Sequence, residues 1–369
     1  QILCDAGHPF GATWGPDGTI VFNPSEIDGL WRVPASGGEP EQLISPQFEQ
    51  GDVIIWWPEF LPDGEAVLFT THRGLTADTS RIELLDLESR ERKTVIENCS
   101  FARYVPTGHL IFGQRGTLHA APFDAERREV TGPSVPLHEP IFYDSVMGVP
   151  NLAVSTGGNL AFIPGGGAPR RQLVSVDLEG KERPLVEARR GYMYPRFSPD
   201  GERLAVTISE PGDTNIWVVD LRTGAQTKLT QEGTNLVPMW TPDGERVTYL
   251  SDRGGGIFRI DWMRADGHGE RVSLVSSEDA GKWVWPVFWS PDGETLGYLY
   301  NPQSVTPDIW IVTRDGEQEP RPLAATAAPE SGAAISPDGR WLAYVSAESG
   351  QSQVYVQPFP EGGARHQIS

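Results

Sequence analysis

The chain has 369 residues, and its 38% hydrophobic content, with 12 Trp and 14 Phe, is enough for a packed core and excludes a disordered chain. Fifty acidic against thirty basic residues give a formal charge of −20, which disfavours nucleic acid and anionic membrane surfaces as partners because both would be repelled. Two isolated cysteines, Cys4 and Cys99, exclude a disulfide framework and a CxxC motif, and no apolar run approaches the ~20 residues of a membrane span.

The first residues indicate that the chain is part of something longer. Residues 1–6 lack an initiator Met and the basic and apolar regions of a signal peptide, which is typical of a processed product or an excised portion. The same residues match the outermost strand of later repeats, such as 183–187. We therefore expect 1–6 to be either a ring-closing strand or a leftover outer strand.

One short pattern recurs along the whole chain: an apolar residue, a Pro-Asp-Gly turn and an alternating apolar run. Its clearest copy, residues 197–206, predicts a strand, a tight turn and a second antiparallel strand. Related turns occur at 14–18, 60–64, 104–108, 154–158, 197–201, 240–244, 289–293 and 335–339. Their spacing is roughly the 40 to 50 residues of one propeller blade. The sequence thus predicts an all-β protein, a single closed β-propeller of about eight four-stranded blades.

The predicted repeats divide the chain without a helical segment between them. Their approximate bounds are 11–45, 56–97, 101–139, 151–187, 191–231, 234–276, 284–325 and 330–369. The third and fourth repeats have degenerate turns, and the apolar segment 140–150 is long enough to enter the central channel. The alternation in the later third strands predicts matched aromatic positions that pack between blades, at Trp217, Phe258, Trp310 and Tyr355.

These repeats resemble the TolB-like, PD40-type WD40 propeller repeats. The residues that carry the resemblance are 197–201 with 216–220, and 251–255 followed by 257–259. Two longer segments, 35–40 and 348–350 with 354–360, are similar to propeller regions fused to bacterial serine/threonine protein kinases. The resemblance implies a bacterial sensor or protein-binding domain, periplasmic or at the cell surface. The sequence has no glycine-rich phosphate loop, His-Arg-Asp or Asp-Phe-Gly, so it implies no kinase activity.

Propeller ligands bind at the mouth of the central channel, on the loops that enter the innermost strands. Alternation predicts that residues four and six positions before the turn Asp, or its counterpart, both face this channel. Adding Trp285, which lies just before a first strand, the candidate ligand-binding residues are Glu59, Arg103, Asn151, Tyr194, Arg196, Trp57 and Trp285. The same set also suits an ordinary propeller axis filled by side chains and water. The expected partner is a protein, a peptide or a small molecule, and the expected state is a monomer.

A metal-assisted hydrolase of esters, lactones or phosphotriesters is the alternative function. Calcium or another divalent cation prefers several oxygen ligands, and channel Glu, Asn and Asp side chains supply them in such propellers. The candidate ligands are Glu59, Asn151, Asp144, Asn235, Glu330 and His8. Arg103 and Arg196 on the same ring would repel a cation, and no HExxH or Gly-x-Ser-x-Gly motif is present. The sequence therefore leaves catalysis open.

Overall fold

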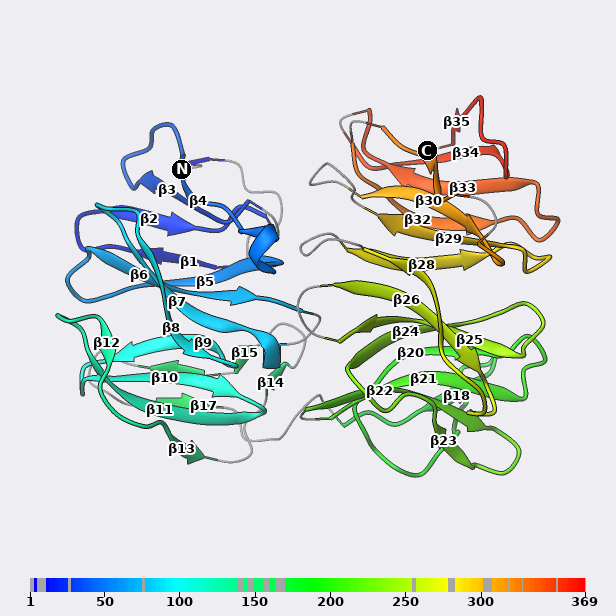
Figure 1. The fold of residues 1–369 in the computed structure, drawn as a ribbon, viewed down its shortest axis with the longest axis horizontal. Coiled ribbons are helices and arrows are strands. Elements are labelled where there is room, and N and C mark those ends of the chain that lie inside the picture. The colour runs from blue at the N-terminus through cyan, green and yellow to red at the C-terminus, as the bar shows by residue number, and fades with distance from the viewer. Residues whose placement is uncertain are drawn as a thin grey trace. The chain divides into compact units, whose positions relative to one another are not determined.

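The computed structural model of the protein (Figure 1) describes residues 3–4, 11–25, 28–74, 77–138, 143–144, 149–150, 152–154, 160–162, 170–210, 212–253, 257–277, 283–300, 307–316, 319–326, 328–349 and 351–368. All strands in these ranges pair antiparallel, and the helices there are two 3-10 turns, Phe48–Gln50 and Ala77–Thr79. The prediction of an all-β protein is confirmed. No helix in the described ranges has both the length and the apolar character needed to cross a membrane.

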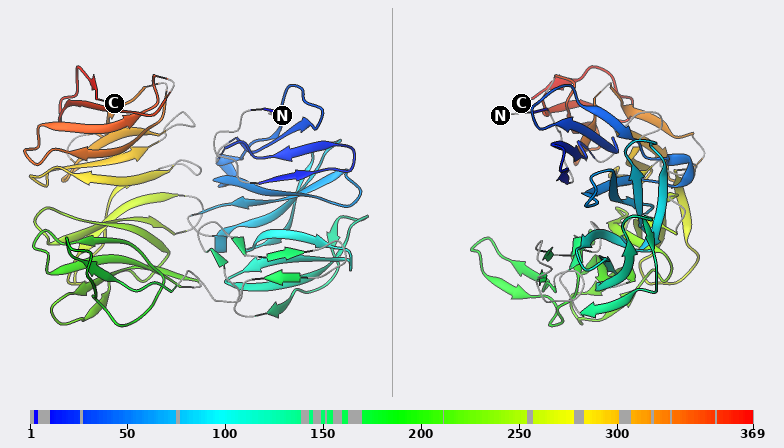
Figure 2. Two further views of the ribbon diagram at one scale, coloured as in Figure 1. Left: turned by 180° about the vertical axis from the view of Figure 1, so that it is seen from behind. Right: turned by 90° about the vertical axis from the view of Figure 1, so that its left-hand side faces the viewer.

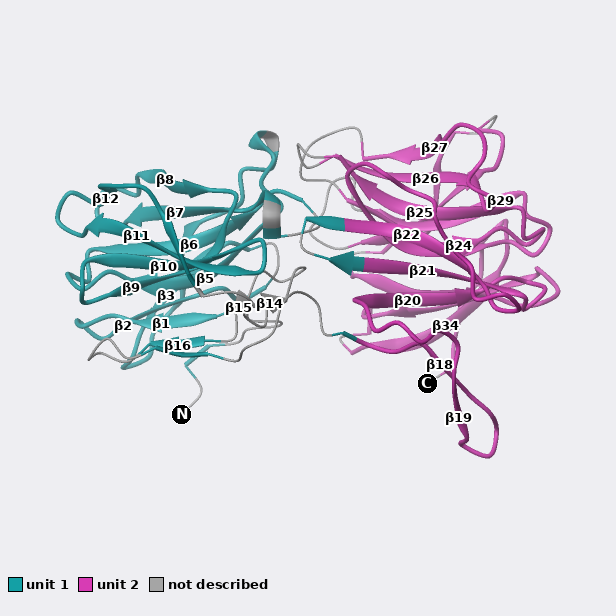
Figure 3. Ribbon diagram, turned by 90° about the horizontal axis from the view of Figure 1, so that it is seen from below, with its two compact units in different colours: residues 1–170, 209–213, 254–256 teal, residues 171–208, 214–253, 257–369 magenta. Residues whose placement is uncertain are grey.

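The chain forms two compact units (Figure 3). Unit 1 comprises residues 1–170, 209–213 and 254–256, and unit 2 comprises 171–208, 214–253 and 257–369. We describe each unit by itself. The ring-closing strand expected at 1–6 and the channel segment expected at 140–150 lie largely outside the described residues and stay predictions.

Unit 1 contains one sheet for each of its first three repeats (Figure 2). The first sheet has the order β1 (Ala12–Trp14), β2 (Thr19–Phe22), β3 (Leu30–Pro34) and β4 (Glu41–Ile44). The second has β5 (Ile54–Phe60), β6 (Ala66–His72), β7 (Arg81–Asp86) and β8 (Arg92–Glu97). The third has β9 (Ser100–Val105), β10 (His109–Gln114) and β11 (Thr117–Asp124), with both β12 (Glu129–Val130) and β13 (Val135–His138) pairing to β11.

The region of the fourth repeat is divided between the two units. In unit 1, β14 (Tyr143–Asp144) pairs with β15 (Val149–Pro150), and β16 (Leu152–Val154) pairs with β17 (Leu160–Phe162). In unit 2, β18 (Val174–Val176) and β19 (Glu182–Pro184) form a projecting two-stranded hairpin whose tip residue Leu178 is fully exposed (Figure 3). A single four-stranded blade at this place therefore stays a prediction.

Unit 2 contains four further four-stranded sheets. They are β20 (Tyr192–Phe197), β21 (Arg203–Glu210), β22 (Asp213–Asp220) and β23 (Gln226–Lys228); β24 (Thr234–Trp240), β25 (Arg246–Asp252), β26 (Phe258–Arg264) and β27 (Val272–Ser276); β28 (Val284–Trp289), β29 (Thr295–Tyr300), β30 (Asp308–Thr313) and β31 (Arg321–Ala324); and β32 (Glu330–Ile335), β33 (Trp341–Ser346), β34 (Gln353–Pro358) and β35 (His366–Gln367). Most sheets in the described residues thus have the four strands of a propeller blade.

The recurring turn owes its sequence to side-chain hydrogen bonds. In the sixth repeat the Thr241 hydroxyl donates to the Asp243 carboxylate at 2.6 Å, and the backbone N–H of Glu245 donates to the same oxygen at 2.9 Å. Gly244 follows with φ of 68°, a left-handed conformation that favours glycine. The short polar residue, the Asp and the Gly are therefore local requirements of one tight turn.

The core of each unit lies between consecutive sheets. In unit 1, Leu68 and Leu84 of the second sheet pack against Phe112 of the third, and all three are almost completely buried. In unit 2, Ile309 of the seventh repeat packs against Tyr344 of the eighth in the same way. Each sheet packs face to face against its neighbours, so the second and third strands carry apolar side chains on both faces.

The structure corrects one of the four matched aromatic positions. Trp310 pairs with Tyr298 and Tyr355 pairs with Tyr344, each opposite a tyrosine of the second strand. In the sixth repeat the residue opposite the corresponding tyrosine is Asp261, whereas Phe258 lies three residues earlier. The prediction for Phe258 was wrong because two aromatics and an acid share this strand, and the sequence pattern alone favoured the wrong aromatic.

A bulge in the innermost strands also changes the predicted alternation. Trp56 pairs with Thr70 and Glu59 pairs with Leu68, so two residues of β5 lie opposite one residue of β6. Cross-strand partners lie on the same face of a sheet, so Glu59 shares a face with Trp56. Simple alternation had placed Glu59 on the same face as Trp57. The same left-handed backbone recurs at this position in other repeats, with φ of 57° at Trp57, 58° at Phe101, 51° at Tyr194 and 54° at Val237.

Candidate functional site

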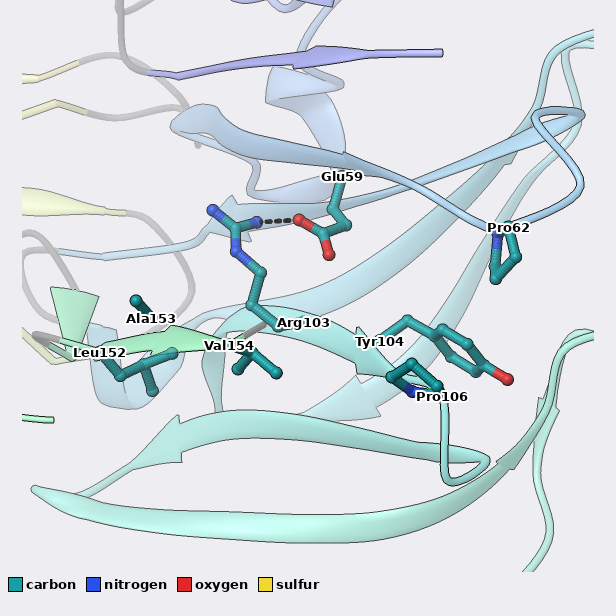
Figure 4. A pocket seen from close by; sticks show the side chains of 8 residues that line it. All are labelled: Glu59, Pro62, Arg103, Tyr104, Pro106, Leu152, Ala153 and Val154. Atoms are coloured by element: carbon teal, nitrogen blue, oxygen red, sulfur yellow. Dashed lines mark ion pairs between the residues drawn. The ribbon is translucent and has the colours of Figure 1, made fainter. Parts of the chain in front are cut away.

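A pocket of about 720 Å³ opens in unit 1 along the innermost strands β5, β9 and β16 (Figure 4). Three lining residues, Glu59, Arg103 and Ala153, each lie four positions before the turn Asp or its counterpart, in repeats two, three and four. The full lining is Glu59, Pro62, Arg103, Tyr104, Pro106, Leu152, Ala153 and Val154. The innermost strands therefore carry a concave surface with a small number of polar groups, as ligand sites do.

The polar centre of the pocket is an ion pair between two predicted site residues. The Arg103 guanidinium lies 2.6 Å from the Glu59 carboxylate, and their side chains are 27% and 24% exposed. Arg103 also stacks over Phe101, with 4.3 Å from its guanidinium carbon to the ring centroid. Burial raises the pKa of Glu59, although the charge of Arg103 acts against this rise. The structure thus joins two residues that lie on different repeats, and each can exchange its partner for a charged group of a ligand.

Aromatic rings adjoin this ion pair. Trp57 and Phe101 meet edge to face with 5.8 Å between ring centroids, and Trp56 lies 6.1 Å from Trp57. The backbone N–H of Phe101 donates to the Thr70 hydroxyl at 2.9 Å, which holds the left-handed residue in place. Trp57, a predicted site residue, thus packs between neighbouring sheets close to Arg103 rather than lining the pocket.

Three other predicted binding residues, Tyr194, Arg196 and Trp285, lie in unit 2. Tyr194 and Trp285 meet edge to face at 6.4 Å between centroids, across the fifth and seventh repeats. Arg196 is exposed, and its carbonyl accepts a hydrogen bond of 2.9 Å from the Trp240 indole. Asn151 lies outside the described residues.

The structure does not gather the predicted metal ligands into one group. Glu59 belongs to unit 1 and pairs with Arg103, whereas Asn235 and Glu330 are buried in unit 2. His8 and Asn151 lie outside the described residues, and for Asp144 only the backbone is described, as part of β14. In the described part of the chain, no three His, Cys, Asp or Glu side chains are close enough together to hold a metal ion.

Sequence reasoning missed the apolar side of the pocket. Tyr104 and Val154 occupy the repeat position three before the turn Asp or its counterpart, and Pro62 and Pro106 are turn residues. The signal was present in the alignment of the repeats, since these positions are fixed by the turn. The prediction considered only residues four and six before the turn and therefore left them out.

The repeated sheets and turns define a protein built from propeller repeats, and comparison with known proteins specifies their type. The TolB beta propeller domain, PD40, matches residues 154–286. A TolB homolog of Chlorobium chlorochromatii strain CaD3 is 28% identical over 131 residues, which cover 35% of this chain and 28% of that protein. The chain thus carries TolB-like, PD40-type propeller repeats, as its sequence predicted.

Two other similar proteins extend the comparison. The uncharacterized peptidase YuxL of Bacillus subtilis strain 168 is 33% identical over 109 residues, which cover 28% of this chain and 16% of that protein. The crystal structure of TolB from Acinetobacter baumannii aligns over 95% of this chain and 65% of that chain, with 17% identity and a TM-score of 0.38. The chain thus matches less than a third of the length of the Chlorobium TolB homolog and of the Bacillus peptidase.

Proposed function

We propose that this chain is a binding domain that recognises a segment of a partner protein through the pocket of unit 1. TolB-like repeats indicate a role in protein interaction, and the Glu59–Arg103 ion pair in that pocket is the observation that supports this site. A half-buried pair beside apolar walls suits a segment that presents charged and apolar side chains together.

Recognition would proceed by exchange of ion-pair partners. A carboxylate of the ligand would take the Arg103 guanidinium, and an ammonium or guanidinium group would take Glu59, while Tyr104 and Val154 contact apolar parts of the segment. The exchange leaves neither buried charge unpaired, which matters because an uncompensated buried charge is costly. The selectivity of the pocket would then depend on the position of both charges.

We also propose that the repeats close into one ring of about eight blades, as a monomer outside the cytoplasm. The support is the run of similar sheets with the turn repeated throughout. A compact particle of this length has a radius of gyration of about 21 Å. Small-angle scattering of the purified chain tests this: a clearly larger value would contradict a closed ring.

The binding proposal is tested with charge variants. Immobilised wild-type chain is incubated with the envelope fraction of the parent organism, and bound proteins are cross-linked and identified. Arg103→Met and the swap Glu59→Arg with Arg103→Glu should lose the captured partner, whereas Arg196→Met, an exposed Arg at the matched repeat position of unit 2, should retain it. Equal capture by wild type and both pocket variants would refute the site.

The alternative function, a metal-assisted hydrolase, has no structural observation in its favour at Glu59, whose carboxylate is paired with Arg103. Unchanged turnover of an ester or phosphotriester by Glu59→Ala would show that any such activity uses other residues.

A further inference from the structure

Two acidic residues meet inside unit 2, and one of them is Glu330, a predicted metal ligand. Asp308 begins β30 of the seventh repeat, and Glu330 begins β32 of the eighth. The Glu330 N–H donates to the carbonyl of Pro307 at 2.9 Å, which joins the two strands where the acids lie. Glu330 is completely buried, and the carboxyl groups are within hydrogen-bonding reach of each other.

Among the described residues, only one carboxylate oxygen of Glu330 accepts hydrogen bonds from the protein. Its Oε1 accepts hydrogen bonds from the Thr326 hydroxyl at 2.6 Å and the Ser346 hydroxyl at 3.0 Å. Its Oε2 and the Oδ1 of Asp308 are buried and have no hydrogen-bond partner among the described residues. The described residues thus offer no donor to these two oxygens, and buried acceptors are costly when left unsatisfied.

The equivalent junction between repeats five and six shows what the acids replace. Asn215 lies two residues before Trp217, as Asp308 lies two before Trp310, and Asn235 and Glu330 both lie eight before the turn Asp. There the Asn235 amide donates to the Asn215 carbonyl oxygen at 3.0 Å. An amide pair supplies its own donor, whereas a carboxylate pair does not.

In the part of the chain that the structure describes, the charges of the two acids are not neutralised by an ion pair. Within the described residues neither Asp308 nor Glu330 takes part in an ion pair, and Arg365, at the eighth repeat, is bonded to Glu348 at 2.6 Å. The described residues thus supply no counter-charge to the two buried oxygens.

We propose that Asp308 and Glu330 bind a hard divalent cation of the Ca²⁺ class, which holds the seventh and eighth repeats together. The carboxylate oxygens Asp308 Oδ1 and Glu330 Oε2 are its protein ligands, and water completes the oxygen shell that such an ion prefers. Thr326 and Ser346 orient Glu330 through its other oxygen. This site is structural and independent of the pocket in unit 1.

The test uses the full chain, with Ca²⁺ or EDTA for stability and Tb³⁺ as a luminescent probe. Trp310 lies two residues from Asp308 and Tyr300 pairs directly with it, so bound Tb³⁺ should be sensitised by excitation of these rings. Ca²⁺ at a hundredfold excess over its dissociation constant should raise the Tm by about 5 °C and displace Tb³⁺.

Variants assign the effect to the two acids. The double change Asp308→Asn with Glu330→Gln recreates the amide chemistry of Asn215 and Asn235, so it should fold without Ca²⁺ and lose both the Tm shift and the Tb³⁺ signal. Glu202→Gln removes an exposed carboxylate of the same unit and should retain both. If the double variant does not fold, Asp308→Asn alone should lose the Tb³⁺ signal.

Two results would overturn the proposal. An equal Ca²⁺ response in the double variant would place the cation elsewhere. A wild-type Tm that ignores Ca²⁺ but rises as the pH falls, with no such rise in the double variant, would show that a shared proton fills the space instead.

Discussion

Replacing Arg92 with Leu is expected to destabilise the second sheet of unit 1 by about 3 kcal/mol. The Arg92 side chain is 9% exposed, and its guanidinium lies 2.6 Å from Asp52 and 3.1 Å from the Thr71 hydroxyl, and also contacts Glu83. Breaking a buried ion pair costs about 3–5 kcal/mol because the remaining charge stays buried. The lower end applies here, since Arg81 remains 3.0 Å from Asp52 and 3.2 Å from Glu83.

A matched control lies one repeat earlier. Arg32 pairs with Glu41 at 2.6 Å, also between third and fourth strands, but the two side chains are 37% and 51% exposed. An exposed pair contributes about 0–1 kcal/mol, so Arg32→Leu should cost little. The readout is hydrogen exchange, of the β7 and β8 amides for the Arg92 variant and of the β3 and β4 amides for the Arg32 variant, because local opening is measured there without assuming one global transition. Equal losses in the Arg92 and Arg32 variants would refute the argument from burial.

The pH dependence supplies a second check on the same residue. Burial raises the pKa of Glu83, but the hydrogen bond and charge of Arg92 outweigh it and hold that pKa below its usual value. The resulting stabilisation is complete above the unfolded pKa of about 4.3 and is lost as the pH falls through the folded pKa. This acid-sensitive step should be smaller in the exchange profile of the Arg92→Leu variant, where Arg81 and the Thr71 hydroxyl are the remaining partners of Glu83.

Three further predictions concern buried groups. Burial lowers the pKa of His72 to about 4, so stability should be complete above pH ~6.5 and decline toward pH 4, and His72→Phe should remove this decline from a series of melting curves. Burial raises the pKa of Cys99, so an alkylating reagent should label only the other cysteine until the protein is unfolded, as mass spectrometry can determine; labelling of native Cys99 would contradict its burial. Gly297→Ala would place a Cβ 2.2 Å from the Phe288 ring and should cost about 3 kcal/mol in urea unfolding, against about 1 for Gly316→Ala, where φ is 70° and no atom lies within 4 Å; equal costs would contradict the steric argument.

The elements that could be predicted from the sequence are those fixed by local chemistry. The turn at Thr241, Asp243 and Gly244 is stabilised by hydrogen bonds within the turn and to the start of the next strand. Its recurrence in the sequence therefore predicts the pairs of strands that it connects. The bulge at Trp57 is different, because its left-handed backbone depends on pairing with the next strand and carries no glycine to mark it. Alternation counted along a single strand could not detect the extra residue.

The candidate site was predictable residue by residue but not as an arrangement. Glu59 and Arg103 were selected because they occupy the same repeat position, which places them on neighbouring innermost strands. Their direct ion pair of 2.6 Å depends on how two sheets pack, and no sequence spacing specifies that distance. The pair also changes the chemical interpretation, since a carboxylate bonded to a guanidinium is poorly suited to a cation but can exchange partners with a charged ligand.

The repeats differ in chemistry at one position of the third strand, and this explains why the aromatic pattern is incomplete. The residue opposite the second-strand aromatic is Trp310 in the seventh repeat but Glu83 in the second and Asp261 in the sixth. In these two repeats an arginine faces the acid, Arg92 of β8 in the second repeat and Arg271, directly before β27, at 3.1 Å in the sixth. An acid with an arginine fills the space of one large ring while keeping the buried charge paired. A search for aromatic residues alone therefore shifts the register of such repeats, whereas acid and arginine considered together preserve it.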